Sequence, residues 1–200
     1  MLKDEVERVR EALADLCEPL HDAFVWAGQR KSEALPELIH AEYKWHGTHT
    51  VRALAHHRLR KMNLGVWALS GNHARNGELW VTDSDYSVRV LHALNDRDVP
   101  PPGVNRARRA YYHNPPLPAQ EKLTGPAYDR LIALWRLDVK TGAASFRVVR
   151  PIGRWRFGGT AKTDLDFPLP ETAVDMRSLH FEPADEGLDD VRLPEEEDGK

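Results

Sequence analysis

Apolar residues in the first twenty positions recur at alternating spacings of four and three, the period of an amphipathic helix. They are Leu2, Val6, Val9, Leu13, Leu16 and Leu20. Pro19 has no backbone N–H, so we expect it to kink the helix or to start a new one. Because the spacing is also that of a coiled coil, the stripe can serve the chain's own core, a homodimer or a protein partner.

The pattern predicts two more helices before residue 64. Ser32 is expected to cap a helix that runs over residues 32–46, and Thr48 or Thr50 a helix that runs to about Met62. One edge of this third helix carries basic side chains, namely Arg52, Arg60 and Lys61.

The chain changes character after the third helix, where short runs of alternating residues predict strands. Residues 66–69 and 78–82 are two such runs, and residues 130–138 and 145–150 predict a hairpin. Residues 86–94 fit either a strand or a helix, with the helix slightly favoured.

Together these patterns predict an α+β fold in which N-terminal helices pack on a small, mostly antiparallel β-sheet. Residues 1–64 form the helical region, and residues 65–181 form a mixed β-rich region of the same domain with a long basic loop. Residues 182–200 contain nine carboxylates and two basic side chains and are poor in large apolar groups. Such a segment cannot bury enough surface to offset its chain entropy, so we expect a disordered acidic C-terminal tail.

The formal charge of the whole chain is −3, but the charge is strongly segregated. Residues 44–162 carry 20 basic and 8 acidic side chains, a net charge of +12, whereas the acidic tail carries −7. A basic surface attracts polyanions through a term that does not depend on nucleotide sequence. The acidic tail can compete with phosphate for that surface.

Prolines on both sides predict that residues 99–118 form a surface loop or arm. This segment combines arginines with aromatic side chains, namely Arg106, Arg108, Arg109, Tyr111 and Tyr112. Single-stranded nucleic acid is bound by that combination, through backbone neutralisation and base stacking. The leading hypothesis is therefore a non-catalytic accessory protein that contacts nucleic acid here and needs no cofactor, with the basic edge of the third helix in support.

A second hypothesis starts from Asp83 and Asp85, two carboxylates that project from the same face of an extended strand. Such a pair can share a divalent cation. The residues Gly71-Asn72-His73-Ala74-Arg75 precede the pair, with seven residues between Arg75 and Asp83. This arrangement resembles the glycine-then-DxD signature of polymerase-beta-like nucleotidyltransferases, although Asn72 stands where that family has Ser or Gly.

The resemblance implies a magnesium-dependent nucleotidyltransferase-like enzyme. Gly71 would form the turn that cradles nucleotide phosphates, and Asp83 and Asp85 would hold Mg²⁺. Asp138, at the end of a predicted strand, is the candidate for the third carboxylate.

The chain contains one cysteine, Cys17, which excludes an internal disulfide. No run approaches the roughly 18 apolar residues of a membrane span, and no signal peptide opens the chain. These features predict a cytoplasmic protein.

Overall fold

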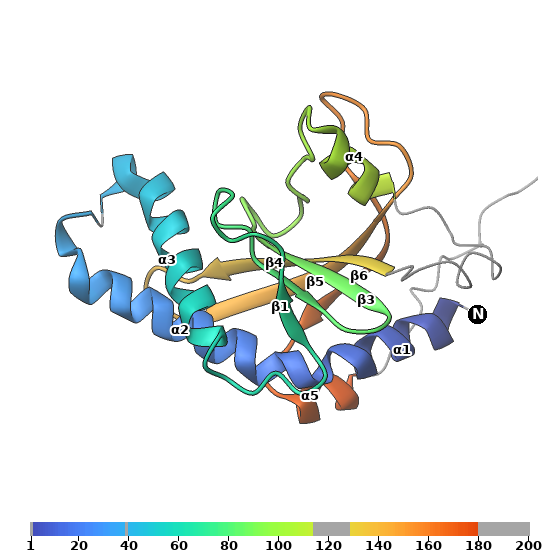
Figure 1. The fold of residues 1–200 in the computed structure, drawn as a ribbon, viewed down its shortest axis with the longest axis horizontal. Helices are drawn as coiled ribbons and strands as arrows, with labels where there is room; N and C mark the ends of the chain where they lie inside the picture. The colour runs from blue at the N-terminus through green and yellow to red at the C-terminus, as the bar shows by residue number, and fades with distance from the viewer. Residues whose placement is uncertain (1, 39, 114–128, 180–200) are drawn as a thin grey trace, which may run out of the picture.

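The computed structural model describes residues 2–38, 40–113 and 129–179, which form helices packed on a six-stranded β-sheet (Figure 1). The helices are α1 (Leu2–Leu13), α2 (Cys17–Ala34), α3 (Lys44–Leu59), α4 (Arg106–His113) and α5 (Ala173–Ser178). The strands are β1 (Ala68–Ser70), β2 (Trp80–Thr82), β3 (Tyr86–His92), β4 (Asp129–Leu137), β5 (Ala144–Ile152) and β6 (Lys162–Leu169). The predicted α+β fold is confirmed, and the acidic tail lies outside the described residues.

The N-terminal helical segment breaks where Pro19 requires it. A 3₁₀ turn, Ala14–Leu16, separates α1 from α2, and Pro19 lies in the first turn of α2. A proline ring clashes with the carbonyl four residues earlier, which here belongs to Asp15. In the first turn of α2 the missing N–H costs no hydrogen bond, so the break falls just before the proline.

The prediction of a helix over residues 32–46 is wrong. Ser32 lies inside α2, where its hydroxyl donates to the Gly28 carbonyl at 3.0 Å. The helix ends at Ala34, because the residue before Pro36 is disfavoured in helical conformation. Two 3₁₀ turns, Pro36–Leu38 and Ala41–Tyr43, then lead into α3, which begins at Lys44 rather than at Thr48 or Thr50.

The strands follow one another in sequence order across the sheet, and every neighbouring pair is antiparallel except β3 and β4. The hairpin predicted over residues 130–138 and 145–150 is confirmed as β4 and β5. The helix favoured for residues 86–94 is wrong: they form β3, in which Tyr86, Val88 and Val90 alternate into the main core. Strand β6 was not predicted.

The sheet is covered on both faces. Side chains of α1, α2, α3 and α5 pack against one face, and α4 packs against the other with Tyr111 and Tyr112 (Figure 1). Strand β4 is central, so its run Leu131–Trp135 is buried on both faces. The stripe residues Val6, Val9, Leu13, Leu16 and Leu20 are all buried in the main core. The coiled-coil-like spacing therefore serves the chain's own fold in this structure.

A buried arginine connects α1 to the sheet. The Arg150 side chain is 8% exposed and donates to Glu5 at 2.5 Å, to both carboxylate oxygens of Asp164 at 2.9 and 2.8 Å, and to Asp129 at 3.4 Å. The hydrogen bond from Arg150 lowers the pKa of Glu5 below its usual value. This cluster fixes the N-terminal helix over β5 and β6.

The predicted surface arm at residues 99–118 contains a helix instead. Asn105 caps α4, because its Oδ1 accepts the backbone N–H of Arg108 at 3.1 Å. Residues 114–118 lie outside the described part. None of the helices in residues 2–38, 40–113 and 129–179 has the length and apolar character of a membrane span.

Candidate anion-binding site

Two adjoining hollows of about 570 and 400 Å³ lie beside the loop over residues 71–79. They have five lining residues in common, namely Arg75, Asn76, Glu78, Arg89 and Arg108. The first is also lined by Trp80 of β2 and Tyr111 of α4, and the second by His49 and Arg52 of α3. We call the two hollows together the arginine cleft.

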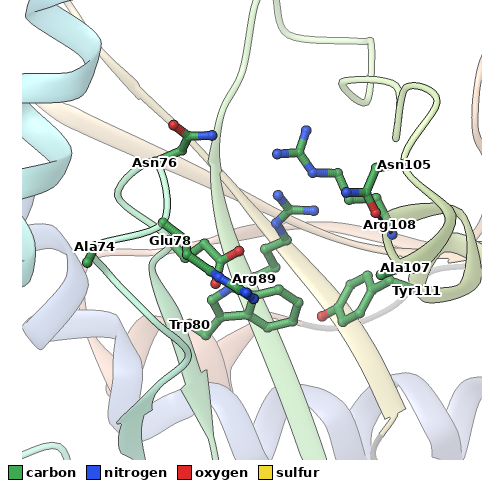
Figure 2. A pocket seen from close by; sticks show the side chains of 10 residues that line it. Ala74, Asn76, Glu78, Trp80, Arg89, Asn105, Ala107, Arg108 and Tyr111 are labelled. Carbon is green, nitrogen blue, oxygen red and sulfur yellow. Dashed lines mark hydrogen bonds between the residues drawn. The ribbon is translucent and has the colours of Figure 1, made fainter.

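Arg89 forms the floor of the arginine cleft. Alternation along β3 sends Arg89 to the face covered by α4, opposite the core residues Val88 and Val90. The residue is only 9% exposed, yet its guanidinium points into the same space as that of Arg108 (Figure 2). Burial, and next the charge of Arg108, lowers the pKa of Arg89.

The Trp80 ring, next to Arg89, is held on several sides. Trp80 and Arg89 are cross-strand partners, with the guanidinium carbon 5.4 Å from the ring centroid. Tyr111 meets the indole edge-on, with ring centroids 4.9 Å apart. Gly71 has φ +81°, and a Cβ there would come within 2.8 Å of Trp80 Cδ1, so only glycine fits beside the ring.

Arg52 is fixed against the turn that borders the cleft. Its Nη2 donates to the Asn76 carbonyl at 2.6 Å and to His49 Nδ1 at 2.9 Å. Asn76 and Gly77 both have positive φ, +52° and +64°, and a Cβ on Gly77 would lie 3.1 Å from Arg52 Nε. Burial, followed by the charges of Arg89 and Arg108, lowers the pKa of Arg52.

The side chains of Arg75, Arg89 and Arg108 form no hydrogen bond or ion pair with any other described residue. Five arginines elsewhere in the fold form ion pairs of this kind: Arg58 with Asp22, Arg136 with Asp96, Arg147 with Asp166, Arg150 with Asp164 and Arg177 with Glu11. Among the described residues that line the cleft, Glu78 is the only acidic one. With four arginines and one glutamate, the cleft carries a net charge of +3.

Three of the residues predicted to contact nucleic acid, Arg52, Arg108 and Tyr111, line the cleft. Tyr111 is 8% exposed, and its hydroxyl lies 2.6 Å from both the Ser87 and the Leu131 carbonyl oxygens, so it can donate its proton to only one at a time. The ring is therefore part of the structural support of the cleft and offers little surface for base stacking.

The other residues of that prediction lie outside the cleft. Arg109 donates to the Gly103 carbonyl at 3.0 Å, and its guanidinium lies over Trp155, 5.6 Å from the ring centroid. Tyr112 is 2% exposed and donates to the Pro100 carbonyl, and burial raises its pKa to about 12. Arg60 and Lys61 follow the C-terminal end of α3, and Arg106 is exposed at the start of α4.

The carboxylates of the second hypothesis lie at different ends of the sheet. Asp83 closes the β2–β3 turn, accepting the N–H groups of Asp85 at 2.8 Å and Tyr86 at 2.6 Å. Asp138 lies beyond the opposite end of β4 from that turn, where it accepts the N–H groups of Lys140 and Thr141.

Strand β4 has nine residues, a span of about 30 Å at roughly 3.3 Å per residue. Gly71 lies at the Trp80 end of β2, away from Asp83 and Asp85. Within the described residues, no three His, Cys, Asp or Glu side chains are placed to hold a metal ion.

Sequence reasoning missed Arg75, Arg89 and Trp80. Arg89 had a usable signal: it is a lone charge between Val88 and Val90, in a run whose alternation marks one face as apolar. Reading residues 86–94 as a strand would have placed this charge on the opposite face. Arg75 had no such signal, because its position depends on how the loop over residues 71–79 folds.

Comparison of the chain with protein-family models, with curated proteins and with solved structures gives no match.

Proposed function

We propose that this protein binds single-stranded nucleic acid through its phosphate groups at the arginine cleft, as a non-catalytic accessory protein. The observation that carries the proposal is the convergence of Arg75, Arg89 and Arg108 with no carboxylate bonded to any of them within the described residues. Like charges repel, so a cluster of this kind costs stability unless an anion occupies it.

Phosphate is the anion that this chemistry fits best. A guanidinium presents a planar fork of N–H donors, which matches the oxygens of a phosphate and binds them in pairs. Arg89 is already desolvated in the free protein, so a phosphate that reaches it does not have to displace a full hydration shell from the cation. Arg75 and Arg108, which are exposed, add charge at the rim.

The dimensions of the cleft favour a strand over a duplex. Hollows of about 570 and 400 Å³ fall in the usual range for small ligands, roughly 300–1,000 Å³. A short stretch of a single strand can enter such a space, whereas a duplex would contact only the rim. The size of the cleft thus favours contacts to the sugar–phosphate backbone of a short stretch of a single strand.

Fluorescence anisotropy with a labelled single-stranded oligonucleotide, titrated at several salt concentrations, tests this function. The double variant Arg75→Gln/Arg108→Gln should bind about tenfold or more weakly, because charge-assisted hydrogen bonds contribute roughly 1.5–3 kcal/mol each. The slope of log K against log salt should fall by about 0.7 for each phosphate that the variant no longer neutralises.

Arg154→Gln/Arg156→Gln is the matched control, since both side chains are exposed and lie outside the cleft. It should retain the wild-type affinity and salt slope. An equal decrease in affinity in the two double variants, or no measurable binding by the wild type at low salt, would disprove the proposed function.

The proposed cellular location is the cytoplasm. Cys17, the first residue of α2, is a free cysteine buried in the main core. Burial raises the pKa of its thiol to about 12. A neutral, enclosed thiol suits a protein that folds in a reducing compartment.

A further inference from the structure

We infer that the arginine cleft is specific for the phosphorylated end of a strand, a terminal phosphate monoester, over the internal phosphodiesters of the same strand. This inference rests on the proposed function and specifies the part of the nucleic acid that enters the cleft. It follows from the depth of Arg89, from the charge of the cleft and from the positions of its arginines.

Depth separates the arginines into two classes. Arg75 and Arg108 are exposed, while Arg89 is 91% buried and lines both hollows of the cleft. An internal phosphodiester continues into nucleotides on both sides, so it can lie along the rim but cannot descend to the floor. A terminal phosphate continues on one side only and can enter end-on.

Charge favours the same ligand. A phosphate monoester carries between −1.5 and −2 charges near pH 7 and has three free oxygens, whereas a diester carries −1 and has two. The cleft has a net charge of +3, with Glu78 as its only acidic lining residue among those described. The ligand with the higher charge and the additional acceptor therefore gains more from this cleft than a diester does.

The four arginines come from four separate parts of the fold: Arg52 from α3, Arg75 from the loop over residues 71–79, Arg89 from β3 and Arg108 from α4. In Figure 2, Arg89 rises from below and Arg108 comes from the α4 side, toward one space. Donors that approach from several directions suit a compact group with three free oxygens better than an extended backbone. The start of α4 lies at the same cleft through Asn105, and its dipole favours an anion there.

The test compares oligonucleotides of one sequence that carry a 5′-phosphate, a 3′-phosphate or hydroxyl groups at both ends, each labelled at an internal base. One of the two phosphorylated strands should bind at least about tenfold more tightly than the hydroxyl strand. Arg89→Gln should abolish this preference while leaving weak, salt-sensitive binding at the rim. Arg154→Gln, the control, should preserve the preference.

The pH dependence of the wild type gives a second measurement if Arg89→Gln does not fold. The ratio of affinities for phosphorylated and hydroxyl strands should fall between pH 7.5 and 5.5, because the second ionisation of a monoester lies near pH 6. His49 and Glu78 also line the cleft and face both strands, so the ratio of the two affinities, not either affinity alone, is the measured quantity.

The failures of the two proposals are distinguishable. Equal affinity for all three strands, still weakened by Arg75→Gln/Arg108→Gln, overturns the end specificity and leaves the proposed function standing. No binding of any strand overturns both. Displacement of the phosphorylated strand by inorganic phosphate or a nucleoside monophosphate at equal concentration would show that the ligand is a free phosphate compound, which also overturns the inference.

Discussion

Arg89 and Trp80 face each other across β2 and β3, with the Arg89 guanidinium carbon 5.4 Å from the centroid of the indole ring. A cation over an indole is stabilised by the negative face of the ring, but the ring does not neutralise it. Arg150, also buried, is bonded to three carboxylates. Arg10, the third buried arginine of the described residues, lies over the Phe167 ring, 6.0 Å from its centroid, and outside the cleft. Of the three, Arg150 is satisfied by carboxylates, and only Arg89 faces the arginine cleft, where a ligand can reach it.

Replacing Arg89 with methionine should stabilise the free protein while abolishing its preference for phosphorylated strands. Removing an uncompensated buried charge and retaining the apolar volume is expected to raise the free energy of unfolding by about 1 kcal/mol. Urea unfolding monitored by tryptophan fluorescence measures this change. A variant that is less stable than the wild type and still prefers phosphorylated strands would contradict this role of Arg89.

The same substitution at Arg150 should have the opposite effect on stability. Arg150→Met leaves Glu5, Asp129 and Asp164 without their common cation, and breaking a buried pair in this way costs about 3–5 kcal/mol. Urea unfolding should show this decrease, with oligonucleotide affinity unchanged wherever the variant remains folded. If Arg89→Met and Arg150→Met shift stability equally and in the same direction, the distinction between a binding arginine and a structural one fails.

Gly77 lines the cleft and Gly142 does not, although both have a similar backbone conformation. Substitutions at these two glycines distinguish the effect of backbone strain from the effect of a contact with Arg52. Gly77 and Gly142 have φ values of +64° and +71°; a Cβ on Gly77 would press on Arg52, while one on Gly142 meets nothing within 4 Å. Each alanine substitution should cost about 1–2 kcal/mol of stability, because an L-residue is strained in this region. Only Gly77→Ala should also weaken oligonucleotide binding, since it displaces Arg52. Equal affinities for the two variants in anisotropy titrations would argue against a role for Arg52.

Stability should depend on pH through a pair of stacked histidines. The rings of His56 and His73 lie 3.8 Å apart at an angle of 5°, and His73 Nδ1 donates to the Glu78 carbonyl at 3.0 Å. Burial, followed by the nearby His73 and Arg60, lowers the pKa of His56 below its usual 6.5. The neutral form therefore stabilises the fold above pH 6.5, and this contribution disappears as the pH falls through 6.5 toward the lowered pKa.

Urea unfolding at pH 7.5, 6.5 and 5.5 measures this decrease in stability. His56→Phe should reduce it, because phenylalanine retains the stacked ring and removes the titration. An identical pH dependence in the wild type and in His56→Phe would exclude the histidine pair as its source.

The main core was predictable from sequence because its signal is local. The spacing of Val6, Val9, Leu13 and Leu16 marks one face of a helix, and that face is buried on the sheet. The hairpin of β4 and β5 was predictable for the same reason, since alternating runs and a glycine turn lie within about twenty residues. Periodicity could not choose between strand and helix for residues 86–94, where β3 is determined by its partners β2 and β4.

The candidate site was only partly predictable. Basic charge in the middle of the chain was visible from composition, and Arg52 and Arg108 were named from it. Arg89 and Arg75 join them only because the sheet register and the loop over residues 71–79 bring four distant segments together. The aromatic residues next to the arginines in sequence, Tyr111 and Tyr112, are used for packing instead.

The most direct test of the central claim is to locate a bound oligonucleotide by NMR through the indole N–H signals of the tryptophans. Trp80 lies in the arginine cleft beside Arg89, whereas Trp67 lies in the main core, where its Nε1 donates to the Ala12 carbonyl at 3.1 Å. Each signal is assigned by substitution with phenylalanine. A 5′- or 3′-phosphorylated strand should shift the Trp80 signal in a saturable manner and leave the Trp67 signal in place. A bound strand that leaves the Trp80 signal unmoved would contradict the central claim.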